Sequence, residues 1–305
     1  MIEYLIKLNQ KQELQKIQKY KPNCWINVNN PSKQEIDFLV ENFNLEKDLI
    51  LDGLDIHEIP RIEEENNKAY IYLTIPTTKI TNEYTSSFLI IISKNILITI
   101  SNSELEIIDK IKNFKNFLTN KKTRSLLQIL LFLSNSFSVK IRNILKEVKK
   151  DRRNIKNLND KDILDLVIQE DILNDYLASF SPLIHMHAMM LKLKSIKFIE
   201  DEKEVIEDLI VDLNQTLMSC KSALKTISNM RDYYQTTISN NLNKILKILT
   251  IFTVFLTIPA VIGGIYGMNI QLPAQNTKNI FWVLSGLTIG IWGITLILFK
   301  KSRIL

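Results

Sequence analysis

Polar and small side chains recur near the end of the chain, in a stretch where charged residues are few. They follow one another at steps of three, four or seven: Asn243, Thr250, Thr253, Thr257, Ala260, Gly264 and Gly267. In a helix this spacing places them on one side. A row of amide and hydroxyl oxygens open to water could line a pore, whereas small residues could equally form a packing face for another helix. The residues alone leave both interpretations open.

The same region contains two long segments without charge. Ile248 to Tyr266 spans 19 residues and Ile280 to Phe299 spans 20 residues. Each is long enough to cross a hydrocarbon core of about 30 Å as a helix. A pair of buried core helices is the alternative, but the Gly, Thr and aromatic content favours a helical membrane hairpin.

The charges that flank the two segments predict their orientation. Lys244 and Lys247 precede the first, the 300–303 region adds three basic residues after the second, and the loop between them holds only Lys278. By the positive-inside bias, both ends of the hairpin lie in the cytosol. We therefore expect a multi-pass protein of the inner (cytoplasmic) membrane, with both termini and most of the chain cytosolic.

Little in the sequence suggests catalysis. Six of the seven glycines fall between Gly263 and Gly293, and only Gly53 lies earlier, so the clustered glycines of a dinucleotide or phosphate site are missing. Cys24 and Cys220 are far apart and form no CxxC, which supports neither a disulfide framework nor a zinc site. No Ser-His-Asp or Cys-His set stands out. We predict that the protein is not an enzyme.

Two further patterns are weak. His185 and His187 form an H-x-H pair, but residues two apart diverge on a helix. The run from Lys140 to Lys156 is basic but lacks the interleaved aromatic residues of a nucleic-acid surface, and the net charge of +6 is modest. We interpret the run as a solvated helix face and expect no nucleic-acid partner.

The cytosolic part divides into two patterns. Strand-like runs at Cys24–Val28, Ala69–Ile75, Phe88–Ile92 and Ile96–Ile100, with a helix opened by the capping box Ser32–Glu35, predict a mixed α/β layer domain. From about Ser103 the pattern is helical.

A long helix is expected after Pro182, because no proline or glycine follows until Pro259. Apolar residues recur there in a three-four rhythm, at positions 206, 210, 213, 217, 220, 224 and 227, and Arg231 is the one clear charged break. Such a stripe often reflects core packing, but its continuity with a membrane segment favours a stalk.

The segment Tyr266-Gly267-Met268-Asn269 lies at the outer end of the first membrane segment. This Gly-Met-Asn triplet, before a short loop, a second membrane segment and a basic end, resembles the CorA family of divalent-cation channels. The resemblance continues at Trp25–Val28 and in Phe43–Glu63, where Asp52, Pro60-Arg61 and Glu63 fall at similar spacings. It covers essentially the whole chain.

The resemblance implies a fold class and an activity. The implied fold class is an α+β membrane protein with an N-terminal α/β/α layered cytosolic domain. A long stalk helix follows this domain and continues into the first of two transmembrane helices. The implied assembly is a funnel-shaped homopentamer. The activity is passive influx of Mg²⁺, with Co²⁺, Ni²⁺ and Zn²⁺ as further candidate ions, closed by intracellular Mg²⁺. The partners are further copies of the chain and the lipid bilayer.

The resemblance also assigns residues. Gly267, Met268 and Asn269 form the selectivity filter, because a ring of amide oxygens can accept hydrogen bonds from hydrated Mg²⁺ without forcing its dehydration. The pore lining consists of Asn243, Leu246, Leu249, Thr250, Thr253, Thr257 and Gly264. Asn243 forms an inner polar ring, and Leu246 and Leu249 form the apolar gate. Asp52 and Asp208 bind regulatory Mg²⁺ between neighbouring subunits.

One feature departs from the family pattern, since the loop Ile270–Asn279 contains no Asp or Glu and one Lys. In the family this loop often carries a glutamate that attracts cations, so attraction by a charged ring, and with it the selectivity among divalent ions, does not follow from the resemblance. Two alternatives to the channel are a ZntB-type zinc transporter and a membrane-tethered sensor or scaffold without transport. The expected domains are a cytosolic α/β domain at 1–102, a cytosolic helical region at 103–244 with its stalk helix at 197–244, transmembrane helix 1 at 245–268, an external loop at 269–279, transmembrane helix 2 at 280–299 and a basic cytosolic tail at 300–305.

Overall fold

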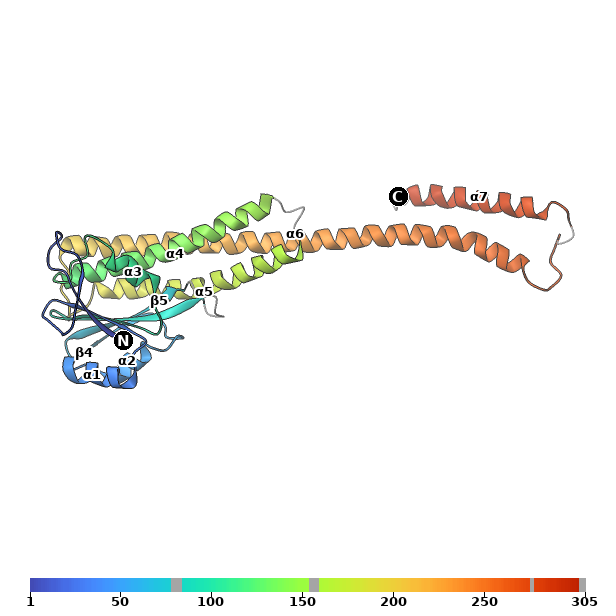
Figure 1. Cartoon of the computed structure of the whole chain (residues 1–305). Coiled ribbons are helices and arrows are strands. Elements are labelled where there is room, and N and C mark those ends of the chain that lie inside the picture. The colour runs from blue at the N-terminus through green and yellow to red at the C-terminus, as the bar shows by residue number, and fades with distance from the viewer. Residues whose placement is uncertain (78–83, 154–158, 275–276, 302–305) are drawn as a thin grey trace. The chain divides into compact units, whose positions relative to one another are not determined.

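The computed structural model describes residues 1–77, 84–153, 159–274 and 277–301 (Figure 1). Lys156 of the basic run, residues 275–276 of the predicted external loop and Arg303 of the predicted tail lie outside these ranges. The chain forms two compact units, Met1–Met230 and Arg231–Leu305. The residue limits of the predicted domains stay a prediction.

The first unit contains a seven-stranded sheet in the order β2-β1-β3-β7-β6-β5-β4. Its strands are β1 Ile2–Ile6, β2 Gln15–Ile17, β3 Trp25–Asn29, β4 Arg61–Glu65, β5 Lys68–Pro76, β6 Thr85–Ile92 and β7 Leu97–Ser101. All neighbouring pairs are antiparallel except β3 and β7, where Ile26 lies opposite Ile98.

Helices cover both faces of this sheet, because its central strands are apolar on both sides. On β5, Tyr70 and Tyr72 belong to the core shared with α1 (Lys33–Phe43) and α2 (Lys47–Asp52). Ala69 and Ile71 point to the other face and belong to the core shared with α3 (Glu106–Lys112), α4 (Lys122–Arg153) and α5 (Asp160–Met190). The alternation of side chains along a strand thus produces the predicted α/β/α layers.

The four predicted strands and the predicted capping box are present. The Ser32 hydroxyl accepts from the Glu35 N–H at 3.2 Å, and the Glu35 carboxylate accepts from the Ser32 N–H at 2.9 Å. The sequence analysis missed β1, β2 and β4. The strands β2 and β4 lie at the two edges of the sheet and are largely polar, so they lack the apolar pattern of central strands.

Helix α6 runs from Glu200 to Tyr266, and its 67 residues extend for about 100 Å. Its buried residues in the first unit are Ile206, Leu209, Leu213, Thr216, Cys220, Ala223, Ile227 and Met230. The predicted positions 206, 213, 220 and 227 are buried. Ile210, Leu217 and Leu224 are partly buried and pack against the same core, whose fully buried residues lie one place earlier at these points. Met230 takes the core position, which removes the apparent break at Arg231.

The early glycine, Gly53, has a packing role. It ends α2, and a Cβ added there would lie 2.6 Å from Leu89 Cδ2 of β6. The buried Ser87 hydroxyl donates to the Gly53 carbonyl at 2.6 Å. Glycine therefore lets the end of α2, and with it Asp52, lie directly on the sheet.

Candidate ion-conducting face

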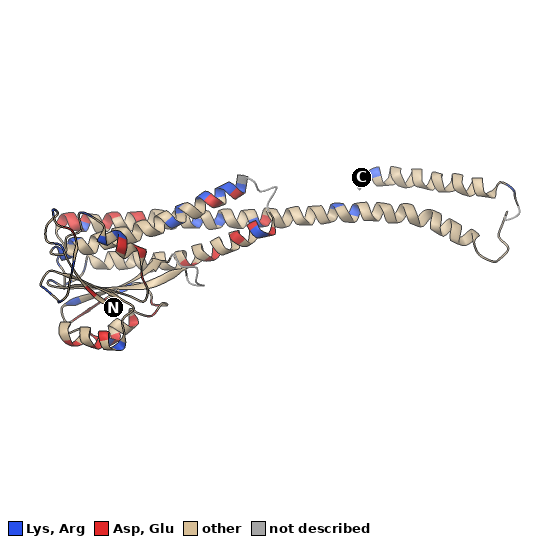
Figure 2. Ribbon diagram, in the orientation of Figure 1, with Lys and Arg blue, Asp and Glu red and all other residues tan. Residues whose placement is uncertain are grey.

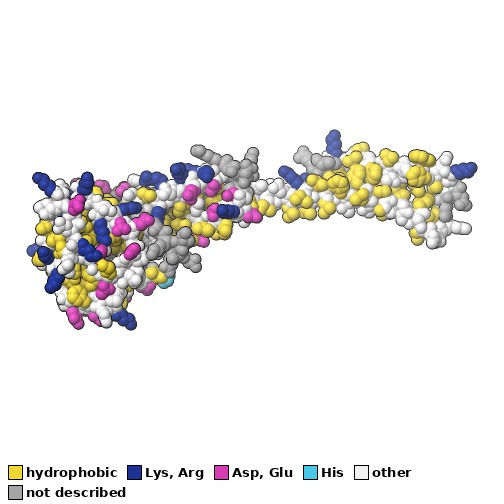
Figure 3. Space-filling model, in the orientation of Figure 1, with side chains coloured by type: hydrophobic (Ala, Val, Ile, Leu, Met, Phe, Trp, Pro, Cys, Tyr) yellow, Lys and Arg dark blue, Asp and Glu magenta, His cyan; other side chains and the backbone are white. Residues whose placement is uncertain are grey.

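Two apolar helices in the second unit are exposed to their surroundings. The C-terminal part of α6 contains an apolar stretch with a mean hydropathy of 2.3, and 0 % of this stretch is buried. Helix α7 (Ile280–Lys301) contains a stretch with a mean hydropathy of 2.0, of which 6 % is buried. Figure 2 shows no charge between Lys247 and the end of α6, and Figure 3 shows hydrophobic side chains gathered over these helices. The exposure excludes the alternative of buried core helices, because core helices would be covered by protein. Both helices are long enough to cross a membrane.

A proline in α6 fixes the place where α7 contacts it. Pro259 has no N–H, so the carbonyl of Phe255, four residues earlier, lacks its helical donor. The indole Nε1 of Trp292 on α7 donates to this carbonyl at 3.0 Å, and the two rings stack with centroids 5.5 Å apart. This hydrogen bond satisfies a backbone group that lipid could not satisfy.

The polar stripe lies on the side of α6 away from this contact. Phe255 is two residues from both Thr253 and Thr257, a rotation of about 200° along a helix. Each of the stripe residues Thr250, Thr253, Thr257, Ala260, Gly264 and Gly267 is exposed, whereas Phe255 is partly covered. Within one chain, therefore, the stripe is not the packing face for α7.

The threonine hydroxyls of the stripe donate their protons within the helix, so that only their oxygen lone pairs are available to groups outside it. Thr250, Thr253 and Thr257 donate to the carbonyls of Leu246, Leu249 and Thr253, at 2.8, 2.8 and 2.7 Å. A hydroxyl whose proton is bound to the preceding turn can act only as an acceptor towards the outside. The stripe is thus a row of oxygen acceptors, which suits a cation or its hydration shell.

The stripe belongs to a longer polar line that the sequence analysis did not find. Residues seven apart on α6 are polar or small and exposed at every position: Asp208, Gln215, Ser222, Asn229, Thr236, Asn243, Thr250, Thr257 and Gly264. The predicted gate residues Leu246 and Leu249 are also exposed, and they interrupt the polar surface beside this line. The spacing of seven was the signal that could have revealed the line.

The segment after Tyr266 makes a tight turn. The Gly267 N–H donates to the Gly263 carbonyl at 2.8 Å, and a Cβ on Gly267 would lie 3.1 Å from that oxygen. The Tyr266 hydroxyl donates to the Pro273 carbonyl at 3.3 Å, which ties the following loop to the helix end. Met268 and Asn269 thus lie exposed just beyond the end of the helix that carries the stripe.

The two predicted regulatory acids are not brought together within one chain. Asp52 ends α2, on one side of the sheet, whereas Asp208 is exposed on α6, which packs in the core of the other side (Figure 1). Among the described residues, no group of three His, Cys, Asp or Glu side chains could hold a metal ion. A site shared by the two acids requires more than one chain.

Asp52 has an unpredicted partner in Arg61 of β4, whose Nη2 lies 3.0 Å from the Asp52 carboxylate. Burial works to lower the pKa of Arg61, but its hydrogen bonds to Glu63 and Asp52 outweigh burial and raise the pKa above its usual value. The guanidinium therefore stays charged beside Asp52.

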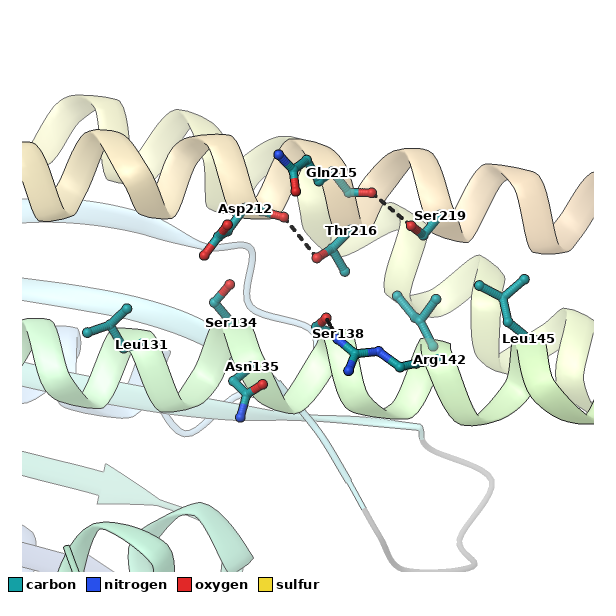
Figure 4. A pocket seen from close by; sticks show the side chains of 11 residues that line it. Leu131, Ser134, Asn135, Ser138, Arg142, Leu145, Asp212, Gln215, Thr216 and Ser219 are labelled. Carbon is teal, nitrogen blue, oxygen red and sulfur yellow. Dashed lines mark hydrogen bonds between the residues drawn. The ribbon is translucent and has the colours of Figure 1, made fainter.

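Two other polar places in the first unit, a groove and the histidine pair, do not have the chemistry of an ion site. A groove of 440 Å³ lies between α4 and α6, but its lining has one acid, Asp212, and one base, Arg142 (Figure 4). His187 is fully buried, its Nδ1 lies 2.7 Å from the Leu183 carbonyl, and burial lowers its pKa, whereas His185 is exposed. The histidine pair forms no common site.

An α/β/α domain, a long helix and two apolar helices, one of them with an open polar face, indicate a membrane protein with two candidate spans. The family described as CorA-like Mg²⁺ transporter protein matches residues 20–301, and the chain belongs to this family. The fold class predicted for the single chain is thereby confirmed.

Known proteins support this assignment. The chain is 26 % identical over 297 residues to the cobalt/magnesium transport protein CorA of Methanocaldococcus jannaschii, covering 91 % of this chain and 90 % of that protein. The complete structure of the CorA magnesium transporter from the same organism superposes with a TM-score of 0.84 at 21 % identity, covering 99 % and 98 % of the two chains. The cytoplasmic domain of ZntB from Vibrio parahaemolyticus shares the fold, with a TM-score of 0.64, 11 % identity and coverage of 78 % of this chain and 98 % of that one.

The contact between Trp292 and the Phe255 carbonyl can be tested directly. We expect Trp292→Phe to destabilise the protein by about 1–3 kcal/mol, because the ring is kept but the carbonyl loses its donor. Pro259→Ala in the same chain should recover most of the loss, since an alanine at this position would restore the helical N–H. Thermal unfolding of the purified protein in detergent measures both effects.

Trp282→Phe is the matched control, because Trp282 is 73 % exposed. Equal stability of the Trp292→Phe variant and this control would contradict the assigned role of the indole N–H.

Proposed function

We propose that this chain is the subunit of a homopentameric channel for passive influx of Mg²⁺, and also of Co²⁺ and Ni²⁺, across the inner membrane. The inside-negative potential drives the ions inwards, and both termini lie in the cytosol. The observation that carries the proposal is the row of oxygen acceptors on α6 that α7 leaves uncovered. Relatives named as magnesium or cobalt/magnesium transport proteins support Mg²⁺ and Co²⁺ among these ions.

Several copies are needed because two helices cannot enclose a conduit. In a ring around one axis, each copy would contribute the polar face of α6, while α7 would lie outside it towards lipid. Two rows of residues on α6 would then face the axis, and within each row the residues are seven positions apart. One row contains Asn243, Thr250 and Thr257, and the other contains Leu246 and Thr253. Of the rings that these two rows would form, the one formed by Leu246 is apolar and the other four are polar.

The rings have different tasks in this proposal. Asn269 forms the outer mouth, where its amide oxygens accept hydrogen bonds from the waters of hydrated Mg²⁺. Gly267 and Met268 shape the turn that presents it. Leu246 and Leu249 form the gate, because a narrow apolar ring loses its water and stops ions, and Asn243 is the polar ring beside it.

The mouth lacks a ring of acids, since Ile270–Asn279 contains only one charged residue, Lys278. Attraction of the ion therefore depends on amide and hydroxyl oxygens rather than on net charge. We expect weaker enrichment of cations at the mouth, and a stronger dependence of influx on the membrane potential.

Intracellular Mg²⁺ closes the channel in this proposal by binding between Asp52 of one subunit and Asp208 of the next. Each acid is exposed, and the two lie in different layers of one chain, so a neighbouring copy can supply the second ligand. The ion offsets the repulsion between the two acids and favours the closed state through its higher affinity for that state.

A zinc transporter of the ZntB type has the same fold, and a sensor without transport would need no open stripe. Reconstitution into liposomes separates the three functions. We expect uptake of Mg²⁺ and Co²⁺ that does not depend on a proton gradient. Proton-coupled Zn²⁺ uptake would favour the ZntB type, and the absence of flux would favour a sensor or scaffold.

The orientation predicts which residues an impermeant thiol reagent reaches from outside. Gln271→Cys, in the loop after the filter, should be labelled in intact cells, whereas Lys301→Cys, at the end of α7, should be labelled only after lysis. The two native cysteines are buried, so they contribute little background. The reverse pattern would overturn both the orientation and the direction of transport.

Replacing Asn269 by Ala tests the filter. The change removes one amide from each subunit at an exposed position, so we expect divalent uptake to fall at least about tenfold while assembly is kept. Gln271→Ala removes an exposed amide two residues further on and should transport like the unmodified protein. Uptake by Asn269→Ala at the unmodified rate would refute the filter assignment.

The double variant Asp52→Asn, Asp208→Asn tests closure. It removes both the ligands and the repulsion that the ion relieves, so the channel should conduct at millimolar internal Mg²⁺, and Mg²⁺ should protect the cytosolic unit less from proteases. Asp48→Asn with Asp201→Asn is the control, because it removes one exposed acid from each of the same helices. Unchanged inhibition in the Asp52, Asp208 variant would place the sensor elsewhere.

A further inference from the structure

Arg61 lies at the centre of three carboxylates around the end of α2. Its Nη2 lies 3.0 Å from Asp52, its Nε lies 2.7 Å from Glu63, and its Nη1 forms an ion pair with Glu58. One guanidinium therefore joins the end of α2, the loop before β4 and β4 itself. With one positive and three negative groups, the cluster carries a net charge of −2 at neutral pH.

The guanidinium is fixed by more than ion pairs. It stacks over the ring of Tyr72 on β5, 4.0 Å from the ring centroid, and the Tyr72 hydroxyl donates to the Leu49 carbonyl of α2 at 3.0 Å. Arginine cannot lose its proton in this environment. The positive charge beside Asp52 is thus permanent and held in place from both α2 and β5.

Asp52 remains accessible in spite of this pair. Its side chain is 49 % exposed, and its Oδ2 carries the contact with Arg61. An incoming Mg²⁺ would therefore meet a carboxylate that already shares its charge with a guanidinium, and the two cations would repel each other at short range.

We infer that the Arg61 guanidinium competes with Mg²⁺ for the Asp52 carboxylate and thereby sets the internal Mg²⁺ concentration at which the channel closes. This inference rests on the proposed function, because it concerns the regulatory site formed by Asp52 and Asp208. Arg61 acts through Asp52 and touches no transported ion, so it is a positioning residue. Its charge weakens the site so that closure requires more Mg²⁺ than the acids alone would require.

Replacing Arg61 by Gln tests the inference in the full-length channel in liposomes, with Mg²⁺ as the only added divalent ion. The variant leaves three acids without their cation, so half-maximal inhibition should occur at about three- to tenfold lower internal Mg²⁺. Arg61→Met, which keeps the apolar contact with the Tyr72 ring, should shift inhibition in the same direction if Arg61→Gln assembles poorly.

Lys47→Gln is the matched control. Lys47 lies on α2, the helix that carries Asp52, and like Arg61 it forms an ion pair, but with Asp37 at 2.6 Å. The control removes one positive charge near Asp52 without freeing Asp52, and it should keep the original threshold. Arg61→Lys keeps the charge but loses the planar fork, so its threshold should lie between those of the unmodified channel and Arg61→Gln.

The outcomes separate the inference from the proposed function. An unchanged or higher threshold in Arg61→Gln, together with relief of inhibition in Asp52→Asn, would overturn the inference and leave the regulatory site standing. An equally lowered threshold in Lys47→Gln would also overturn the inference, because the loss of any positive charge near the site would then lower the inhibitory Mg²⁺ concentration. If Mg²⁺ neither inhibits the unmodified channel nor protects it from protease, the inference falls with the regulatory site, whereas Mg²⁺ influx itself would still stand.

Discussion

The missing N–H of Pro259 is the constraint on which the arrangement of the membrane helices depends. A helix in lipid must satisfy each of its carbonyls from within the protein, and the Phe255 carbonyl finds its donor in Trp292. This contact fixes which side of α6 is covered by α7. The opposite side, with its threonine oxygens, is thereby left for contacts outside the chain, and the function proposed above depends on that free side.

A second constraint acts in the first unit, where the sheet separates two sets of helices. Asp52 and Asp208 lie on different sides of the sheet, so their carboxylates cannot share an ion within one chain. The proposed regulatory contact between them can form only between chains, so in that proposal the oligomer that forms the pore would also form the Mg²⁺ sensor. Gly53 contributes by letting the end of α2 lie against β6, where the neighbouring Asp52 comes within reach of Arg61.

The sequence predicted those features that depend on local pattern. The central strands, the Ser32 capping box and the two membrane segments follow from runs of apolar residues and from cap chemistry, and each is present. The edge strand β4 was missed because Arg-Ile-Glu-Glu-Glu has no apolar alternation. The role of Arg61 was missed because its three acids and Tyr72 come from different elements, and only the folded sheet brings them together. On α6, Leu209 and Ile210 are both apolar and both contact the core, so sequence alone does not say that Leu209 is the more deeply buried of the two.

The polar line on α6 has a mechanical consequence. Asp208 and Gly264 are 56 residues apart, which is eight repeats of seven, and a straight helix drifts by about 20° in each repeat. Over eight repeats the drift is about 160°, so in untwisted helices the two ends of the line would face nearly opposite directions. Helices that keep the whole line towards one axis must wind around each other with a left-handed twist. In such a bundle, any change of twist imposed near Asp208 is carried as torsion along each helix and turns the side chains of the membrane segment about the axis.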